Sequence, residues 1–231
     1  MDTMAEQLLC TLSPLSYVRQ LAILVVVWCS TGSHPLLHLP AASAGVTELS
    51  TSRDHVLQVP LSVVSSLVNA CALPDSPSSL TDAAILQFID AVGGARGLLS
   101  LLGVRETVGS RTLCPLTRQQ CVAAFTRAHG REKLTVGARA FTKHCQRSAD
   151  GWWGVVKGGD AAKNATALAK LEELLATCVW RNVHSLPHSD ATFELRNARG
   201  FGARWYVCDD ASFRGFLEPP MADGHENRWR H

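Results

Sequence analysis

The chain has 231 residues, of which 46% are apolar and 18% charged, and its formal net charge is +2 at pH 7. This composition is ordinary for a globular protein and excludes a chain too polar to build a hydrophobic core. The net charge hides an asymmetry: residues 1–95 carry −5, residues 96–147 carry +8 and residues 148–231 carry −1. The +8 stretch would attract a phosphate-bearing partner if its arginines share a face; otherwise it forms solvated helix faces.

The most apolar segment is Leu-Ala-Ile-Leu-Val-Val-Val-Trp at residues 21–28. It is too short to span a bilayer comfortably, but its length suits the core of a signal peptide. Residues 42–44 (Ala-Ser-Ala) have the form of a cleavage site, whereas Asp2 and Glu6 stand where a signal peptide has basic residues. The segment is therefore a signal or membrane anchor, a buried strand, or a poorly ordered extension. A membrane is a partner only if residues 21–28 act as an anchor.

Residues 30–79 are rich in Ser, Pro, Ala and Leu without sustained periodicity, and residues 73–79 form a dense cluster of structure-breaking residues. We place the main domain boundary at that cluster. The sequence thus predicts a leader at 1–45, a Ser/Pro/Ala-rich linker at 46–79 and a single α+β domain at 80–231.

The first half of that domain is predicted to be helical. Helices are expected over residues 81–92 and 95–102, each followed by glycine. Thr117 and Gln120 have the spacing of a capping box and begin a third helix, which ends before Gly130. Thr135 can cap a fourth helix that reaches about residue 146.

The fourth helix carries a basic stripe, since Arg139, Lys143 and Arg147 are spaced by four residues. Such a stripe can contact phosphate oxygens, because neutralising backbone charge needs no base-specific geometry. The alternative is an exposed face with no partner.

The second half begins with Trp152 and Trp153 in a glycine-rich loop, where core packing is favoured over stacking on a ligand. A long helix is expected from residue 161 to about 179, with a continuous apolar face. Three segments with alternating pattern follow, at 192–197, 203–207 and 213–217. The predicted fold is α+β: a helical basic first half plus a long helix packed on a three-stranded antiparallel meander.

Alternation in the meander separates two faces. Phe193, Leu195, Trp205 and Val207 should face the helix, and the opposite face should hold Glu194, Arg196, Arg204 and Tyr206, joined by Arg214. Arginines and a tyrosine on an open face could bind a carboxylate, a phosphate or an unpaired base. The alternative pairs Glu194 with a neighbouring arginine in a solvated salt-bridge ladder.

The C-terminal tail supplies weak candidates for acid and base groups in Asp223, His225, Glu226 and His231. There is no His-Glu-x-x-His pattern, so we predict no metal site, although His184 and His188 could complete one. The sequence also lacks a dinucleotide-binding fingerprint, a phosphate-binding loop and a Gly-x-Ser-x-Gly elbow. We therefore predict no cofactor, and whether the protein is an enzyme stays open.

Eight cysteines are scattered along the chain without a Cys-x-x-Cys pair. This favours reduced cysteines and an intracellular location, cytoplasmic or nuclear. A secretory or membrane-anchored protein, directed by residues 20–44, is the alternative.

An ordered series of motifs in residues 130–231 resembles a widespread family of conserved proteins with no assigned activity or cofactor. The resemblance implies a domain boundary and a tail folded onto the domain, and it implies no mechanism. Its motifs here are Leu134-Thr-Val-Gly-Ala-Arg-Ala140 with Lys143-His144, Trp152-Trp-Gly154 with Lys163-Asn164, Gly200-Phe-Gly-Ala-Arg-Trp205, Phe213-Arg-Gly-Phe-Leu-Glu-Pro219, Asp223-Gly-His225 and Trp229-Arg-His231.

The function that the sequence favours is a non-enzymatic module that binds an anionic partner, with RNA the leading candidate. The residues expected to engage it are Arg139, Lys143, Arg147, Arg196, Arg204, Tyr206 and Arg214. One alternative is a small hydrolase-like enzyme that uses the acid and histidine residues of the tail. The other is a protein-interaction domain that uses Trp152 and Trp153 to hold a protein partner.

Overall fold

The computed structural model describes residues 2–43, 45–72, 78–131, 133–148, 151–185 and 190–220. In chain order its elements are α1 (Asp2–Cys10), α2 (Tyr17–Thr31), the 3-10 helix η1 (Pro35–His38), α3 (Thr51–Leu57), α4 (Leu61–Ala72), α5 (Ser78–Ala91), α6 (Gly94–Leu101), α7 (Arg118–Thr126), α8 (Val136–Arg147), the 3-10 helix η2 (Gly151–Trp153), α9 (Asp160–Ala176), β1 (Cys178–Ser185), β2 (Ala191–Asn197), β3 (Gly202–Tyr206) and β4 (Ser212–Leu217).

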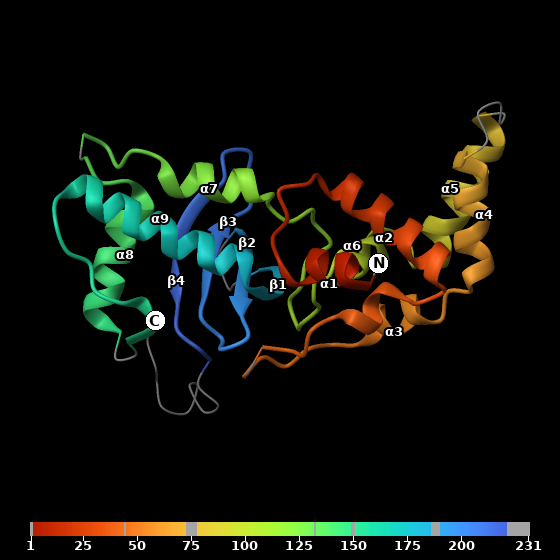
Figure 1. Cartoon of the computed structure of the whole chain (residues 1–231), viewed down its shortest axis with the longest axis horizontal. Coiled ribbons are helices and arrows are strands. Elements are labelled where there is room, and N and C mark those ends of the chain that lie inside the picture. Colours follow the sequence, from red (N-terminus) through yellow and green to blue (C-terminus); the bar gives the residue numbers. More distant parts are fainter. Residues whose placement is uncertain are drawn as a thin grey trace.

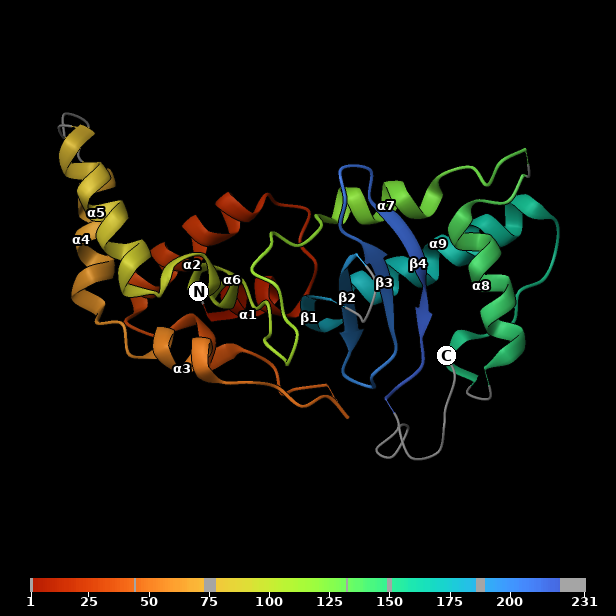
Figure 2. The same ribbon diagram turned by 180° about the vertical axis from the view of Figure 1, so that it is seen from behind.

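The fold is α+β, as predicted. The four strands form one antiparallel sheet in the order β1-β2-β3-β4, and helices α7, α8 and α9 cover one of its faces (Figure 1). Helices α1 to α6 gather beyond the β1 edge, and the reverse view shows the same division (Figure 2). The sheet therefore lies between a helical layer on one face and a helical N-terminal half at one edge.

The main hydrophobic core fills the space between the sheet and helices α7 to α9. Aromatic rings meet there edge to face: Phe125 lies 4.9 Å from Phe213, and Trp153 lies 4.9 Å from Phe216, between ring centroids. Trp152 stacks on Phe201 at 4.5 Å with the ring planes 7° apart. The prediction that the paired tryptophans pack on the core is confirmed.

The starts of the predicted helices agree with the structure where a side chain caps them. The Thr117 hydroxyl accepts from Gln120 N and the Gln120 side chain accepts from Thr117 N, which makes the capping box that begins α7. The Thr135 hydroxyl accepts from Ala138 N at the start of α8. Both helices pack apolar residues against the sheet, and α8 also bears the basic residues predicted for it.

The prediction of three strands is wrong by one, because the long helix ends at Ala176 and residues after it form β1. The Thr177 hydroxyl donates to Glu173 O at 2.7 Å as the helix ends. From there Val179, Trp180 and Val183 have side chains that suit a pleated strand. The new strand extends the sheet toward the N-terminal half.

The N-terminal half is helical where the sequence predicted a leader and a linker. Residues 21–28 lie inside α2, which the Ser16 hydroxyl caps at the N-terminus, so a strand in this segment is wrong. Trp28 and Val64 are buried in a second core, which the linker segment joins through helices α3 and α4. The division into leader, linker and domain, like a signal or anchor role for residues 20–44, stays a prediction.

Within the described ranges no single helix is long and apolar enough to cross a membrane. Two bent pairs pass the same test of length and composition together: Thr51–Leu57 with Leu61–Ala72, and Leu80–Ala91 with Gly94–Leu101.

Buried arginines join the two halves of the molecule. Arg181 of β1 donates from Nη1 to Thr11 O at 2.7 Å and from Nη2 to Leu8 O at 3.1 Å, and it also reaches Leu102 O. Arg105 pairs with Glu48 at 3.1 Å, donates to Pro40 O, and reaches β1 through a 3.4 Å bond from Nη2 to Val179 O. These bonds hold the N-terminal half against β1 and so fix what covers the sheet there.

Candidate functional site

The face of the sheet away from the core helices is a row of polar side chains. Register places Asn182 of β1 opposite Glu194 of β2, and Glu194 opposite Arg204 of β3. Phe193, Leu195 and Trp205, the intervening residues, are fully buried in the core. The two predicted faces are therefore confirmed, and β1 adds polar residues that the sequence did not assign to the sheet.

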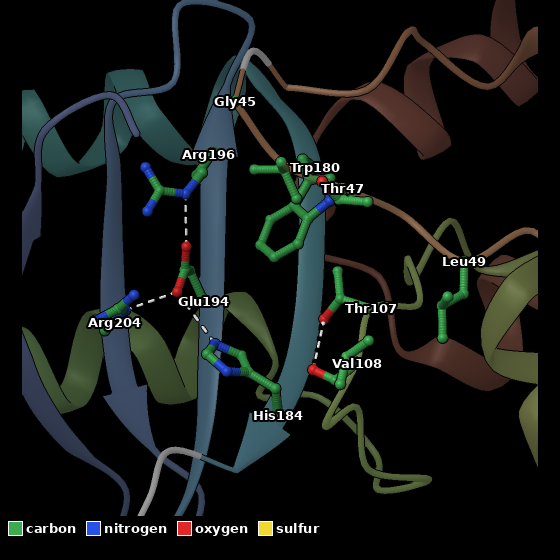
Figure 3. Close-up of a pocket in the computed structure, with 11 residues that line it drawn as sticks. Gly45, Thr47, Leu49, Thr107, Val108, Trp180, His184, Glu194, Arg196 and Arg204 are labelled. Carbon is green, nitrogen blue, oxygen red and sulfur yellow. Dashed lines mark hydrogen bonds and ion pairs between the residues drawn. The ribbon is translucent and has the colours of Figure 1, made fainter. Parts of the chain in front are cut away.

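Glu194 is the centre of this polar face, and it is almost fully buried. Its Oε1 accepts from Arg196 Nε at 2.5 Å, and its Oε2 accepts from Arg204 Nε at 2.6 Å. His184 Nε2 lies 3.1 Å from the same Oε2 (Figure 3). One carboxylate therefore organises two arginines and a histidine from three adjacent strands.

The pKa of Glu194 is low despite its burial. Burial alone would raise it, but the hydrogen bond from His184 and the charges of Arg196 and Arg204 outweigh that effect and lower the pKa to about 2. The carboxylate is thus ionised at neutral pH and can only accept hydrogen bonds. A neutral His184 must then carry its proton on Nε2, which leaves the lone pair on Nδ1. In this tautomer the Glu194 carboxylate orients the imidazole ring, and Nδ1 is the atom that can accept a proton.

A cavity of about 350 Å³, which we call the histidine pocket, opens over this group (Figure 3). It lies between the polar face of the sheet and two segments of the N-terminal half. The sheet contributes Trp180, His184, Glu194, Arg196 and Arg204, and the N-terminal half contributes Gly45, Val46, Thr47, Leu49, Thr107 and Val108. The size falls in the range of small-ligand sites, and the lining mixes apolar walls with a few convergent polar groups.

A second cavity of about 380 Å³, the basic pocket, lies between α8 and strands β3 and β4. Its cationic lining residues are Lys143, Arg147, Arg204 and Arg214. Arg214 is placed there by a β-bulge, since Arg204 pairs with Gly215 and Trp205 with Phe213, which leaves Arg214 as the extra residue. The structure therefore gathers four of the seven predicted anion-binding residues into one cavity.

Arg204 lines both pockets. Its side chain is 20% exposed and its Nε is held by Glu194. Within the described part of the chain the two Nη groups make no hydrogen bond, so they can bind an anion in the fixed fork geometry of a guanidinium. Arg204 is thus shared by the two pockets, and Glu194 links it to His184.

The other three predicted residues lie differently. Arg196 is buried, and its Nη1 donates to Gly200 O and Glu218 O at 2.5 and 3.0 Å, so it holds the end of the sheet together. Arg139 points to the His129 ring, away from both pockets. Tyr206 lies under Arg214, whose guanidinium carbon is 4.4 Å from the ring centroid.

His144 also lines the basic pocket. Its Nε2 lies 2.9 Å from Glu218 Oε1, which also accepts from Trp153 Nε1 at 2.9 Å. Burial lowers the pKa of His144, and the charge of Glu218 opposes that effect. These contacts tie α8 to the end of β4 and shape the floor of the pocket.

The four tail candidates, Asp223, His225, Glu226 and His231, lie outside the described residues, as does His188. Within the described ranges no cluster of three or more His, Cys, Asp or Glu side chains could hold a metal ion. All eight cysteines lie in described segments and are free thiols.

Sequence reasoning considered His184 only as a metal ligand, and it did not single out Trp180 or Asn182. The signal that could have found them is the group of three β-favouring residues, Val179, Trp180 and Val183, which begins where the predicted helix is too long. Their alternation is hidden because the strand is buried on both faces, with Arg181 turned into the N-terminal half.

Comparison with known proteins gives one similarity. Residues 125–218, which span α8 to β4, match the sequence model of the CdiA C-terminal tRNase toxin domain. The motifs of residues 130–231 resemble a family without an assigned activity. The match covers much of the same region, and its family is described as a tRNase toxin domain. No curated protein and no solved structure matches the chain. By this match, the part of the chain that carries His184, Glu194 and Arg204 is similar to a toxin domain described as a tRNase.

Proposed function

We propose that this protein is a ribonuclease of the toxin type, with tRNA as its substrate class. The observation that carries the proposal is the match of residues 125–218 to the tRNase toxin domain, because that span contains His184, Glu194 and Arg204. The geometry of these side chains supports it: an oriented base and a guanidinium with available donors meet in one cavity.

The proposed reaction is attack by a ribose 2′-hydroxyl on the adjacent phosphate. His184 Nδ1 takes the proton of the hydroxyl, the 2′-oxygen bonds to phosphorus, and the bond from phosphorus to the 5′-oxygen of the next nucleotide breaks. That 5′-oxygen takes a proton from water. The products are a 2′,3′-cyclic phosphate end and a 5′-hydroxyl end, and His184 returns its proton to solvent.

Glu194 and Arg204 have separate roles in this reaction. Glu194 fixes the tautomer and orientation of His184 through the 3.1 Å contact at Nε2. The Nη groups of Arg204 stabilise the negative charge that builds on the phosphate oxygens in the transition state. Glu194 also holds Arg204 at its Nε, so one carboxylate positions both the base and the anion-binding group.

The basic pocket binds the RNA backbone beside the site of cleavage. Lys143, Arg147 and Arg214 add three positive charges next to Arg204. Such contacts hold phosphates without reading sequence. RNA binding through basic residues, which the sequence favoured as a complete function, thus becomes the binding step of an enzyme.

An intracellular location, where RNA is available and free cysteines persist, belongs to the same proposal, as does a protein partner.

The experiment is an RNA cleavage assay with the full chain and a tRNA pool, with the product ends identified. We expect 2′,3′-cyclic phosphate and 5′-hydroxyl ends, and a loss of about 10²–10⁴-fold in rate for His184→Ala, as for removal of a general base. His55→Ala, at an exposed position on α3, is the matched control and should cleave at the wild-type rate.

A second arm uses an RNA oligonucleotide that the enzyme cuts, with a 2′-deoxy sugar at the cut position. Since the nucleophile is then missing, cleavage there should stop. Cleavage of the deoxy substrate at an equal rate would refute the 2′-hydroxyl mechanism. Equal rates for wild type and His184→Ala would remove His184 from the reaction.

A further inference from the structure

The histidine pocket has an outer wall that does not come from the span matched by the family. Residues 45–49, which we call the strap, run from Gly45 at the end of the sheet, past Thr47 beside Trp180, to Leu49 beyond the β1 edge, and the loop at Thr107 and Val108 completes the wall (Figure 3). All of these residues precede residue 125, where the match begins. The pocket therefore exists only because the N-terminal half packs against β1.

The strap is fixed at a defined position. Leu49 N donates to Glu106 O at 2.7 Å, and Glu48 is held by the buried Arg105 at 3.1 Å. Gly45 has a φ of +75°, and a Cβ there would come within 2.9 Å of Pro220. The two bonds hold the Glu48 and Leu49 end of the strap, and at the other end the chain passes close to Pro220.

The loop on the other side of the pocket is fixed as well. Asn182 of β1 donates to Thr107 Oγ1 at 3.0 Å and accepts from Ser110 Oγ at 3.0 Å. The wall and the row of polar residues on the sheet are thereby joined through β1.

Trp180 marks one end of this pocket and His184 the other (Figure 3). Trp180 is 3% exposed, and its indole N–H has no acceptor within the described part of the chain. Buried donors nearly always have a partner, and an indole N–H can only donate. Trp180 lines the cavity beside Thr47 (Figure 3), so a ligand acceptor that reaches the edge of the indole there would satisfy this donor.

The surroundings of Trp180 suit a nucleobase. Val46, Leu49 and Val108 give the pocket apolar walls, and Thr47 adds a hydroxyl that can donate or accept. Unpaired bases are recognised by contact with aromatic and apolar side chains together with hydrogen bonds to their polar edges. A phosphate alone would leave the apolar walls without a partner.

We propose that the Trp180 end of the histidine pocket is a base-binding subsite. It takes the base of the nucleotide that adjoins the cleaved phosphate, with Trp180 Nε1 donating to an acceptor on the base edge and Thr47 contacting the same edge. The proposal rests on the proposed ribonuclease function. A base must leave its helix stack to enter a walled cavity, so the substrate is cut at an unpaired nucleotide, and base preference is set partly by the strap.

The test is titration of the full-length protein with the 3′-monophosphates of adenosine, guanosine, cytidine and uridine, followed by calorimetry, with inorganic phosphate as the reference ligand. We expect at least one nucleotide to bind ten-fold or more tightly than phosphate. Trp180→Phe and Thr47→Val should each lower the affinity for that nucleotide by about 3- to 10-fold, as expected for the loss of one hydrogen bond. Neither variant should change the affinity for phosphate.

Thr47 is exposed, so Thr47→Val keeps the test valid if Trp180→Phe fails to fold; Thr166→Val, on the exposed side of α9, is the matched control. Equal affinity for phosphate and all four nucleotides would overturn the subsite, as would variants that bind the preferred nucleotide as wild type does. RNA cleavage without nucleotide discrimination would overturn the subsite and keep the ribonuclease. Discrimination without RNA cleavage would establish a nucleotide site and refute the ribonuclease.

Discussion

The two faces of the sheet differ in what lies against them: helices cover one, and a cavity borders the other. The core face is covered by helices α7 to α9 and packs aromatic rings such as Phe125 and Trp205. The other face borders the histidine pocket, which the strap helps to wall, and it holds an ionised carboxylate between two guanidinium groups. The core face stabilises the fold by removing apolar surface from water, whereas the polar face is stable only while every charge keeps its partner.

The largest loss of stability on the polar face is expected from Glu194→Ala. The change leaves Arg196 buried without its carboxylate, so we expect a loss of about 3–5 kcal/mol in the free energy of unfolding. Urea denaturation of the full chain measures it. Phe125→Ala on the core face should cost about 3–5 kcal/mol as well, through a cavity. A loss below 1 kcal/mol for Glu194→Ala would mean that water reaches and solvates this face.

Acid should weaken the polar face through Glu194. Glu194 has a pKa of about 2 in the folded protein and its ordinary value of about 4.5 when unfolded, so its contribution is present above pH 4.5 and is lost as the pH falls through 2. That contribution is about 3 kcal/mol. Thermal unfolding measured between pH 5 and pH 2 should show a smaller decline for Glu194→Gln than for wild type. Glu6→Gln, at an exposed position of α1, should decline as wild type does.

A smaller loss of stability is expected when a side chain is added to the close-packed core face. Gly137 of α8 lies so close to α7 that a Cβ would come within 2.3 Å of the Phe125 ring. Gly137→Ala should therefore destabilise the protein by about 1–3 kcal/mol, as overpacking does, with no change in the acid dependence of stability. Gly151→Ala has open space around it and serves as the control. Equal stability of the two variants would show that α8 can shift without cost.

The smallest expected effect concerns the basic pocket. Lys143→Ala removes one exposed charge, so binding of a labelled single-stranded RNA should weaken a few-fold. The slope of log affinity against log salt should fall by roughly 0.7, the value for one phosphate contact on a single strand. The His184→Ala background prevents cleavage during the anisotropy titration, and Lys157→Ala is the exposed control. A full salt slope in Lys143→Ala would place the RNA elsewhere.

The sequence predicted the difference between the faces but not which segments wall the pocket on the polar one. Alternation assigned Phe193 and Trp205 to one side and Glu194 and Arg204 to the other, and the structure confirms it. The alternative that paired Glu194 with a neighbouring arginine was right about the pairing and wrong about solvation. Glu194 is buried among side chains of three strands, and the strap that walls the same pocket lies about 150 residues away in the chain; no local pattern predicts such an arrangement.

The candidate site was found in part for a similar reason. Spacing by four residues placed Lys143 and Arg147 on one helix face correctly, but it could not show that Arg139 turns to His129. The β-bulge that brings Arg214 beside them is a property of strand pairing. The sequence suggested His184 only as a metal ligand, because its contact with Glu194 comes from strand pairing and not from spacing along the chain.

Arg204 lines both pockets, and this shared position constrains how the sequence can diverge in evolution. If the protein acts as we propose, an exchange at Arg204 would alter affinity for RNA and turnover in the same step, so selection could not adjust one without the other there. Residues that line a single pocket are free of this constraint: Lys143 and Arg147 on one side, Thr47 and Val108 on the other. Natural variation among related chains should therefore gather at those positions and spare Arg204.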